Sequence, residues 1–280
     1  MKKKAIAVLW AVMMAVGMTA RTEVPELRRA ILLTYYGTSD DSARAVSTDV
    51  LTQRVREAFP DVEVRESYTS RAAANAMRRR TGKPHPSVEQ GMKQLEADGY
   101  NSVIVVSGEL IEGSASRLQE HRIDTLRHHF FEVKTVKPLL TTSDDCRRVM
   151  TALAGQLDLQ PDEHVVFVTD GRNGRAEAVL SLCDYILQHE GYDHCHMATA
   201  EGYPSMENVK QRLRQSHAQR VVLVPLKLVA SHHNQRLLNT WGEALEAEGY
   251  RVRSVPGAML EYRAVQDIIV DKIREADRQP

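Results

Sequence analysis

The feature that most constrains the fold of this chain is an alternation of apolar, strand-like runs with amphipathic, helix-like segments, which occurs twice in the same order. Short continuous apolar runs are typical of buried parallel strands. They predict strands at 30–35, 62–68, 102–106 and 131–136, and again at 164–169, 195–200, 221–229 and 251–255. Apolar residues at helical spacing predict helices at 39–59, 87–97, 175–189, 206–216, 237–248 and 264–276.

Each half of the chain also carries a glycine just after its first strand, Gly37 in one half and Gly171 in the other. Strands that alternate with helices in this way build parallel sheets covered by helices. The expected fold class is therefore α/β, with two similar βαβ lobes whose parallel sheets face a central cleft. We place an N-terminal lobe at 21–140 and a C-terminal lobe at 141–280, with the boundary near 138–144.

The first 20 residues have the pattern of a secretory signal peptide. Three lysines at 2–4 precede an apolar run at 5–16 and small residues at 17–20. We expect cleavage before Arg21 and an exported protein, periplasmic or associated with the outer membrane; an uncleaved N-terminal anchor is the alternative. The apolar run is shorter than the roughly 20 residues of a membrane span, so no transmembrane segment is expected in the mature chain.

Composition excludes several classes of function. The chain has 37 Lys and Arg against 37 Asp and Glu, and a balanced surface of this kind argues against nucleic acid as a partner. Cys146, Cys183 and Cys195 show no metal-binding or haem-attachment spacing, and we expect buried free thiols, with one disulfide as the alternative. The stretch 81–83 lacks the glycine spacing of a phosphate loop, so no ATP requirement is expected.

Three potential metal ligands each follow a predicted strand of the second half. Asp170 follows the first strand, Glu201 the second, and His233 the third. In an open parallel sheet, ligands bind beyond the carboxyl ends of the strands, so loops distant in sequence meet over one crevice. Carboxylate and imidazole groups suit a divalent first-row metal. His232 precedes His233 directly, and adjacent side chains diverge, so only one is expected to face the cleft.

Several motifs resemble, in their order along the chain, the anaerobic sirohydrochlorin cobaltochelatases of the CbiK type, which belong with the class II, ferrochelatase-like chelatases. The motifs are Tyr36-Gly37-Thr38-Ser39, Tyr68-Thr69-Ser70-Arg71, Ala200-Glu201-Gly202-Tyr203-Pro204-Ser205, and Val224-Pro225-Leu226 with Val229, Ala230 and His233. The resemblance implies a bilobal α/β protein that inserts a divalent metal, Co²⁺ or Fe²⁺, into a tetrapyrrole without ATP. The family that the chain resembles includes exported members. Under this resemblance we assign the turn of Tyr36, Gly37, Thr38 and Ser39 to tetrapyrrole binding.

The resemblance also implies a metal site made of a His, a Glu and a second His. The Glu falls on Glu201 and the second His on His233, whereas the first His is replaced by Asp170. An aspartate still offers an oxygen ligand. A site with one imidazole fewer is harder, and we expect it to bind Co²⁺ or Fe²⁺ differently.

A second departure follows the strand at 102–106, where the family commonly carries a histidine. This chain has Glu109 and Glu112 there. Metal insertion removes two pyrrole protons, and a positioned carboxylate of Glu109, Glu112 or Glu201 can accept them. The alternative for Glu109 and Glu112 is a solvated acidic loop.

Other polar clusters have simpler explanations. We expect His194 and His196 on the surface of an edge strand, His128 and His129 at the end of a polar helix, and Arg78, Arg79 and Arg80 on a solvated face, although these arginines also suit the acidic side chains of a tetrapyrrole. Two functions remain. One is an exported tetrapyrrole chelatase; the other is an extracytoplasmic haem- or tetrapyrrole-binding protein for uptake, which could also remove the metal. Bound haem and a homo-oligomer stay open.

Overall fold

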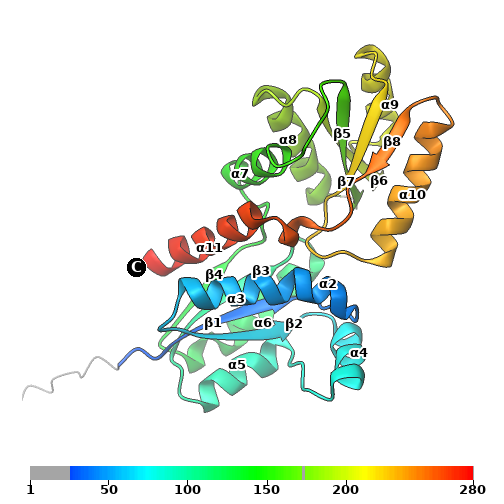
Figure 1. Ribbon diagram of the computed structural model, residues 1–280. Coiled ribbons are helices and arrows are strands. Elements are labelled where there is room, and N and C mark those ends of the chain that lie inside the picture. Colours follow the sequence, from blue (N-terminus) through cyan, green and yellow to red (C-terminus); the bar gives the residue numbers. More distant parts are fainter. Residues whose placement is uncertain (1–25, 172–173, 280) are drawn as a thin grey trace, which may run out of the picture.

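Two four-stranded parallel sheets form the framework of the molecule (Figure 1). The computed structural model describes residues 26–171 and 174–279. The first sheet has the order β2-β1-β3-β4 and the second the order β6-β5-β7-β8, so both lobes have the same topology. The strands are β1 (Arg29–Tyr35), β2 (Glu63–Tyr68), β3 (Ser102–Gly108), β4 (Glu132–Val136), β5 (Glu163–Gly171), β6 (Cys195–Glu201), β7 (Arg220–Pro225) and β8 (Arg251–Ser254). This confirms the expected α/β class with two similar lobes.

Helices cover both faces of each sheet because the strands carry apolar side chains on both faces. The N-terminal lobe contains α2 (Asp41–Val46), α3 (Thr48–Ala58), α4 (Arg71–Thr81), α5 (Val88–Ala97), α6 (Ser114–Leu126) and the short η1 (Arg127–His129). The second half contains α7 (Ser143–Ala154), α8 (Arg175–His189), α9 (Met206–Gln215), α10 (His232–Glu246), η2 (Met259–Glu261) and α11 (Arg263–Arg278). In the described residues, no helix is both long and apolar enough to cross a membrane.

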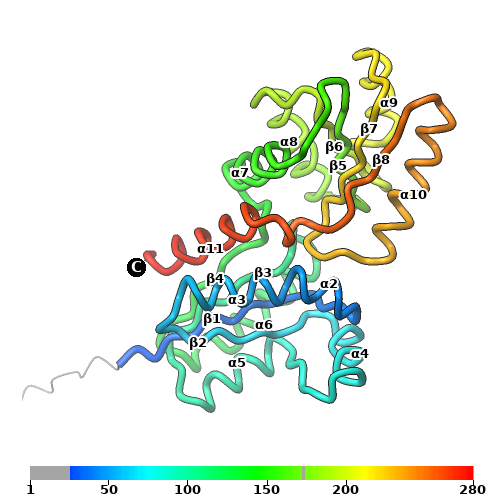
Figure 2. The backbone as a smooth tube through the Cα atoms, in the orientation of Figure 1, coloured from blue at the N-terminus to red at the C-terminus, as the bar shows by residue number. Residues whose placement is uncertain are grey.

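The last helix, α11, joins the two lobes. It packs against α7 of the second half and also against α3, β3 and β4 of the first (Figure 2). Its Asp267 pairs with Arg54 of α3, and Asp271 pairs with Arg148 of α7 at 3.2 Å. The expected boundary at 138–144 therefore separates the two sheets, while the C-terminal helix at 263–278 packs on both lobes.

The expected helix at 39–59 is two helices, and the first begins at Asp41 with Asp40 as its cap, not at Ser39. Asp40 caps α2, since its Oδ1 accepts hydrogen bonds from the backbone N–H groups of Ser42 and Ala43 at 3.0 and 3.1 Å. A carboxylate at this position satisfies free N–H groups and also suits the positive end of the helix dipole. The break falls at Ser47, between α2 and α3.

The sequence did not predict α4 and α7, and it placed the start of α10 too late. Ser70 caps α4 and Thr142 caps α7 in a capping box with Asp145. Ser231 caps α10, accepting a hydrogen bond from Asn234 N at 3.3 Å, so that helix begins at His232, five residues before the expected start at 237. His232 and His233 therefore lie in the first turn of a helix and not in a loop.

Candidate functional site

The carboxyl ends of β5 and β6 bring Asp170 and Glu201 onto adjacent strands. Gly171 pairs with Glu201 in the parallel register. Gly171 has a φ of +69°, and a Cβ there would lie 2.0 Å from the carbonyl oxygen of Glu201. Only glycine fits this close approach in that conformation. The Glu201 side chain is exposed at the end of β6.

The Asp170 carboxylate contacts two cationic or proton-bearing groups at once. Its Oδ1 lies 3.1 Å from Nε2 of His233, and its Oδ2 forms an ion pair with Nζ of Lys227. Burial of Asp170 opposes ionisation, but the hydrogen bond and charge of Lys227, with a smaller contribution from His233, hold the pKa of Asp170 below its usual range. Asp170 is therefore a carboxylate that is paired with Lys227 and His233.

The register between β5 and β7 explains why Lys227 meets Asp170. Val168 is paired with Pro225, and Leu226 N donates to Val168 O at 2.7 Å. Two residues further along the chain are Asp170, still in β5, and Lys227, just beyond the end of β7. Sequence reasoning missed Lys227 because the pairing register cannot be read from the two strands separately.

The structure brings Asp170 and His233 into contact and places Glu201 on the neighbouring strand. Within residues 26–171 and 174–279, no group of three or more His, Cys, Asp or Glu side chains is arranged to hold a metal ion. The full set of Asp170, Glu201 and His233 as ligands therefore stays a prediction.

The turn after β1 carries the second predicted part of the site. Gly37 has a φ of +95°, and a Cβ there would lie 3.1 Å from the Cβ of Ala73 in α4. Thr38 Oγ1 accepts a hydrogen bond from Asp40 N at 3.1 Å, and Ser39 is exposed. Tyr36 is 62% exposed. The turn thus presents an exposed aromatic ring on a backbone fixed against α4.

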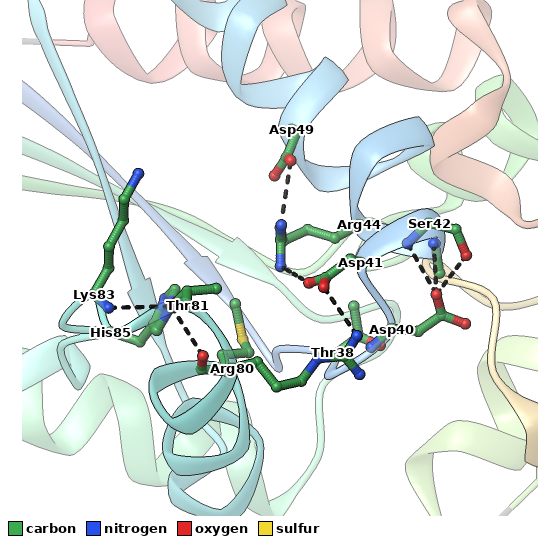
Figure 3. A network of polar contacts seen from close by, with 12 residues as sticks. Thr38, Asp40, Asp41, Ser42, Arg44, Asp49, Arg80, Thr81, Lys83 and His85 are labelled. Atoms are coloured by element: carbon green, nitrogen blue, oxygen red, sulfur yellow. Dashed lines mark hydrogen bonds and ion pairs between the residues drawn. The ribbon is translucent and has the colours of Figure 1, made fainter.

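Ion pairs also connect α2, which follows this turn, to α4 (Figure 3). Asp41 lies between Arg44 and Arg80, with contacts of 2.6 and 3.0 Å. Arg44 also reaches Asp49 at 3.3 Å. Arg78, Arg79 and Arg80 are all exposed, as expected for a solvated face, and Arg80 also forms the ion pair with Asp41.

The strand ends of both lobes border one region between them. Asp40 is close enough to His232 of α10 that the histidine contributes, after the hydrogen bond from Ser42, to a lowered pKa of Asp40. Arg175 of α8 reaches Glu112 of the first lobe at 3.1 Å, and Arg117 lies 3.7 Å from the same carboxylate. Glu112 is thus part of an ion pair between the lobes, not of a solvated loop.

Glu109 lines a small cavity of about 20 Å³ between the lobes. Its other walls are mainly apolar and come from β1, β3, α11 and the segments after β4 and β7. Burial raises the pKa of Glu109, and its Oε1 is buried with no hydrogen-bond partner among the described residues. The solvated-loop alternative is therefore wrong for Glu109, because the second lobe and α11 cover it.

The expectation that His196 lies on an edge-strand surface is also wrong. His196 is 2% exposed, and its Nε2 lies 3.1 Å from Nδ1 of His164 on β5. This face of β6 is covered by α9, which buries Val209 and Leu213 in the same layer. His129 lies in η1 and pairs with Glu96 at 2.8 Å. The three cysteines are buried free thiols, as expected.

Comparisons with known proteins agree with this architecture. The family model described as cobalt chelatase (CbiK) matches residues 29–278. A protein of Nitratidesulfovibrio vulgaris named sirohydrochlorin cobaltochelatase CbiKC is 29% identical over 265 residues, which cover 90% of this chain and 92% of that protein. The sirohydrochlorin cobaltochelatase of Salmonella typhimurium is 26% identical over 208 residues, covering 74% and 78%.

A solved structure extends the agreement to the fold. SirB from Bacillus subtilis, determined with Fe³⁺, superimposes with a TM-score of 0.67 at 14% identity, covering 90% of this chain and 96% of that one. At this identity the likeness concerns the fold alone.

Proposed function

Because this chain belongs to the cobalt chelatase (CbiK) family, we propose that it inserts a divalent metal, Co²⁺ or Fe²⁺, into sirohydrochlorin or a related macrocycle without ATP. The observation that carries this proposal is the family match over residues 29–278, which spans both lobes and the region between them. Chelatase activity is also what the names of the two curated relatives describe.

In this proposal the metal substrate is handled at the strand ends of the second lobe. His233 supplies an imidazole, and Glu201 and Asp170 supply carboxylates from adjacent strands. The Asp170 carboxylate fixes the orientation of the His233 ring through Nε2, an arrangement that tunes imidazole ligands in metal proteins. The exposed Tyr36 ring and the turn to Ser39 would contact the macrocycle from the first lobe.

Two pyrrole protons must leave as the metal enters, and Glu109 is the proposed acceptor. Its unpartnered Oε1 and its apolar cavity make it a stronger base than an exposed glutamate, because burial raises the pKa of Glu109. Glu112 is already engaged in ion pairs with Arg175 and Arg117, so Glu109 is the carboxylate without such a partner of these two. Glu201 is exposed and would act where the metal is released.

The test is an anaerobic absorption assay with purified protein and excess sirohydrochlorin, with and without Co²⁺ or Fe²⁺, in the absence of ATP. Protoporphyrin and haem serve as comparison macrocycles. The proposal predicts continued conversion of sirohydrochlorin beyond one equivalent of protein. A spectral shift that stops at one equivalent with every macrocycle would reject it.

A second candidate is an extracytoplasmic haem- or tetrapyrrole-binding protein that could also remove the metal. The observation that favours it is the ion pair between Asp170 and Lys227, because it already neutralises a carboxylate that the chelatase would use for the free metal, while the His233 imidazole lies beside it. A single oriented imidazole suits an axial ligand of a metal already inside a macrocycle. Stoichiometric binding of haem in the assay above, with no turnover, is the result expected for this candidate.

Export is part of the proposal, on the pattern of residues 1–20, which lie outside the described residues. We propose a periplasmic or outer-membrane-associated protein. N-terminal sequencing of the protein purified from its host should find a start close to Arg21. An intact N-terminus in the cytoplasmic fraction would contradict export.

A further inference from the structure

The ammonium group of Lys227 neutralises Asp170, one of the predicted metal ligands. This ammonium forms an ion pair with Oδ2 of Asp170, while His233 occupies the other oxygen, Oδ1. The side chains of Lys227 and Asp170 are 25% and 26% exposed, so the pair is largely shielded from water. The contact lies directly beyond the last residue pair of β5 and β7, Val168 with Pro225, so the register of the two strands brings the two side chains together.

A metal and the Lys227 ammonium would compete for the same carboxylate. A divalent cation bound to Asp170 would share the carboxylate that the ammonium already neutralises, and two neighbouring cations repel each other in a partly buried site. Conversely, a largely buried carboxylate left without any cation is costly, since its lost hydration is not compensated. The ammonium removes that cost whenever the metal is absent.

We propose that Lys227 is a specificity- and rate-determining residue that weakens the hold of Asp170 on the metal and reclaims the carboxylate as the metal leaves. This inference rests on the proposed function and adds a role for a residue outside the ligand set. A chelatase must release its metal to the macrocycle, so a site that binds the free metal too tightly would slow transfer. A lysine suits this task because its flexible stem can turn the ammonium toward solvent and back.

The experiment compares the parent with Lys227→Met, Lys227→Arg and the double variant Lys227→Met/Asp170→Asn. Lys210→Met is the matched control, because Lys210 of α9 is also poorly exposed, at 13%, and forms an ion pair with Glu248 at 2.6 Å. Affinity is measured by anaerobic titration with Co²⁺ alone. Insertion into sirohydrochlorin gives kcat and the KM for Co²⁺ separately.

Lys227→Met should bind Co²⁺ at least tenfold more tightly, with a lower KM for Co²⁺ and a lower kcat. Lys227→Arg should stay close to the parent, because it keeps the positive charge, and Lys210→Met should match the parent. The double variant should lose the gain in affinity, because it removes the carboxylate for which the two cations compete. It also keeps the inference testable if Lys227→Met folds poorly.

An unchanged or weaker Co²⁺ affinity in Lys227→Met would overturn the inference, and so would a complete lack of Co²⁺ binding in all variants. The proposed function fails separately, if the parent does not insert metal into sirohydrochlorin. A parent without insertion whose Lys227→Met variant nevertheless gains Co²⁺ affinity would uphold the competition and reject the chelatase.

Discussion

Asp170 stands where the family resemblance leads one to expect a histidine, and its surroundings give the substitution a physical meaning. A neutral imidazole at this position would not need a lysine beside it. The carboxylate does, because it is about three-quarters buried and would otherwise carry an uncompensated charge. Asp170 and Lys227 are therefore best understood as one unit that also orients His233.

If Asp170 contributes to metal binding, Asp170→Ala should lower Co²⁺ affinity about tenfold or more, the loss typical of ligands and of their hydrogen-bonded supports. Asp170→His should raise cobalt affinity and cobalt insertion relative to the parent, since it adds a softer nitrogen ligand. Titration with Co²⁺ and thermal unfolding of each variant separate a binding defect from a folding defect. Indifference of Co²⁺ binding to both changes would place Asp170 outside the metal site.

Glu109 should determine the pH dependence of insertion. Burial raises the pKa of Glu109, so the basic, deprotonated form appears at a higher pH than for an exposed glutamate. The insertion rate should therefore rise with pH through this raised pKa, and Glu109→Gln should be slower and lose that rise while keeping its Co²⁺ affinity. Glu207→Gln, at an exposed glutamate of α9, is the control. An unaltered pH profile in Glu109→Gln would exclude Glu109 as the proton acceptor.

At the scale of elements, the histidine pair between β5 and β6 predicts how stability responds to acid. Burial lowers the pKa of His164, and it lowers the pKa of His196 to about 3. The folded state therefore binds fewer protons than the unfolded chain, in which histidine titrates near ~6.5. Stability should fall as pH drops below that value, by at most ~1.4 kcal/mol per pH unit for each histidine.

The variant that checks this is His196→Asn, with His121→Asn at an exposed position of α6 as control. Denaturant unfolding between pH 7 and pH 4 gives the free energy of unfolding for each protein. The parent and the control should lose stability faster than His196→Asn over this range. Parallel curves for all three would show that His196 is not buried in its neutral form.

The strands could be predicted from sequence because parallel strands buried on both faces are continuous apolar runs, as in β3 and β7. The helix α4 could not, since only Ala74 and Met77 of it are buried and no apolar stripe marks it. The first turn of α10 is also polar, so the apolar pattern did not reveal that this helix begins at His232. Caps at Ser70 and Ser231 were the available signals.

The candidate metal site, like the fold, could be predicted from the sequence in part. Asp170, Glu201 and His233 could be placed at the carboxyl edge of one sheet because each follows a strand. Lys227 could not be found in this way, because its partner is fixed by the register between β5 and β7. The burial of Glu109 was also hidden, since the cavity around it is completed by α11, which lies far away in sequence.

At the scale of the whole molecule, α11 makes the two lobes one unit. A single hydrophobic core contains residues of β1 and β3, of β5 and β7, and of α11 itself. Glu112 and Arg175 add a contact between the lobes near the strand ends. The shared core therefore holds the strand ends of the two lobes in a fixed relation to each other.

The measurement that tests this account most directly is the number of turnovers in anaerobic insertion of Co²⁺ into sirohydrochlorin without ATP, for the parent, Glu201→Gln and His233→Ala. His121→Ala is the control for loss of a histidine outside the site. The account predicts many turnovers for the parent and the control, and a loss of at least tenfold in both site variants with unfolding temperatures unchanged. A parent that stops at one equivalent, or site variants as active as the parent, would contradict it.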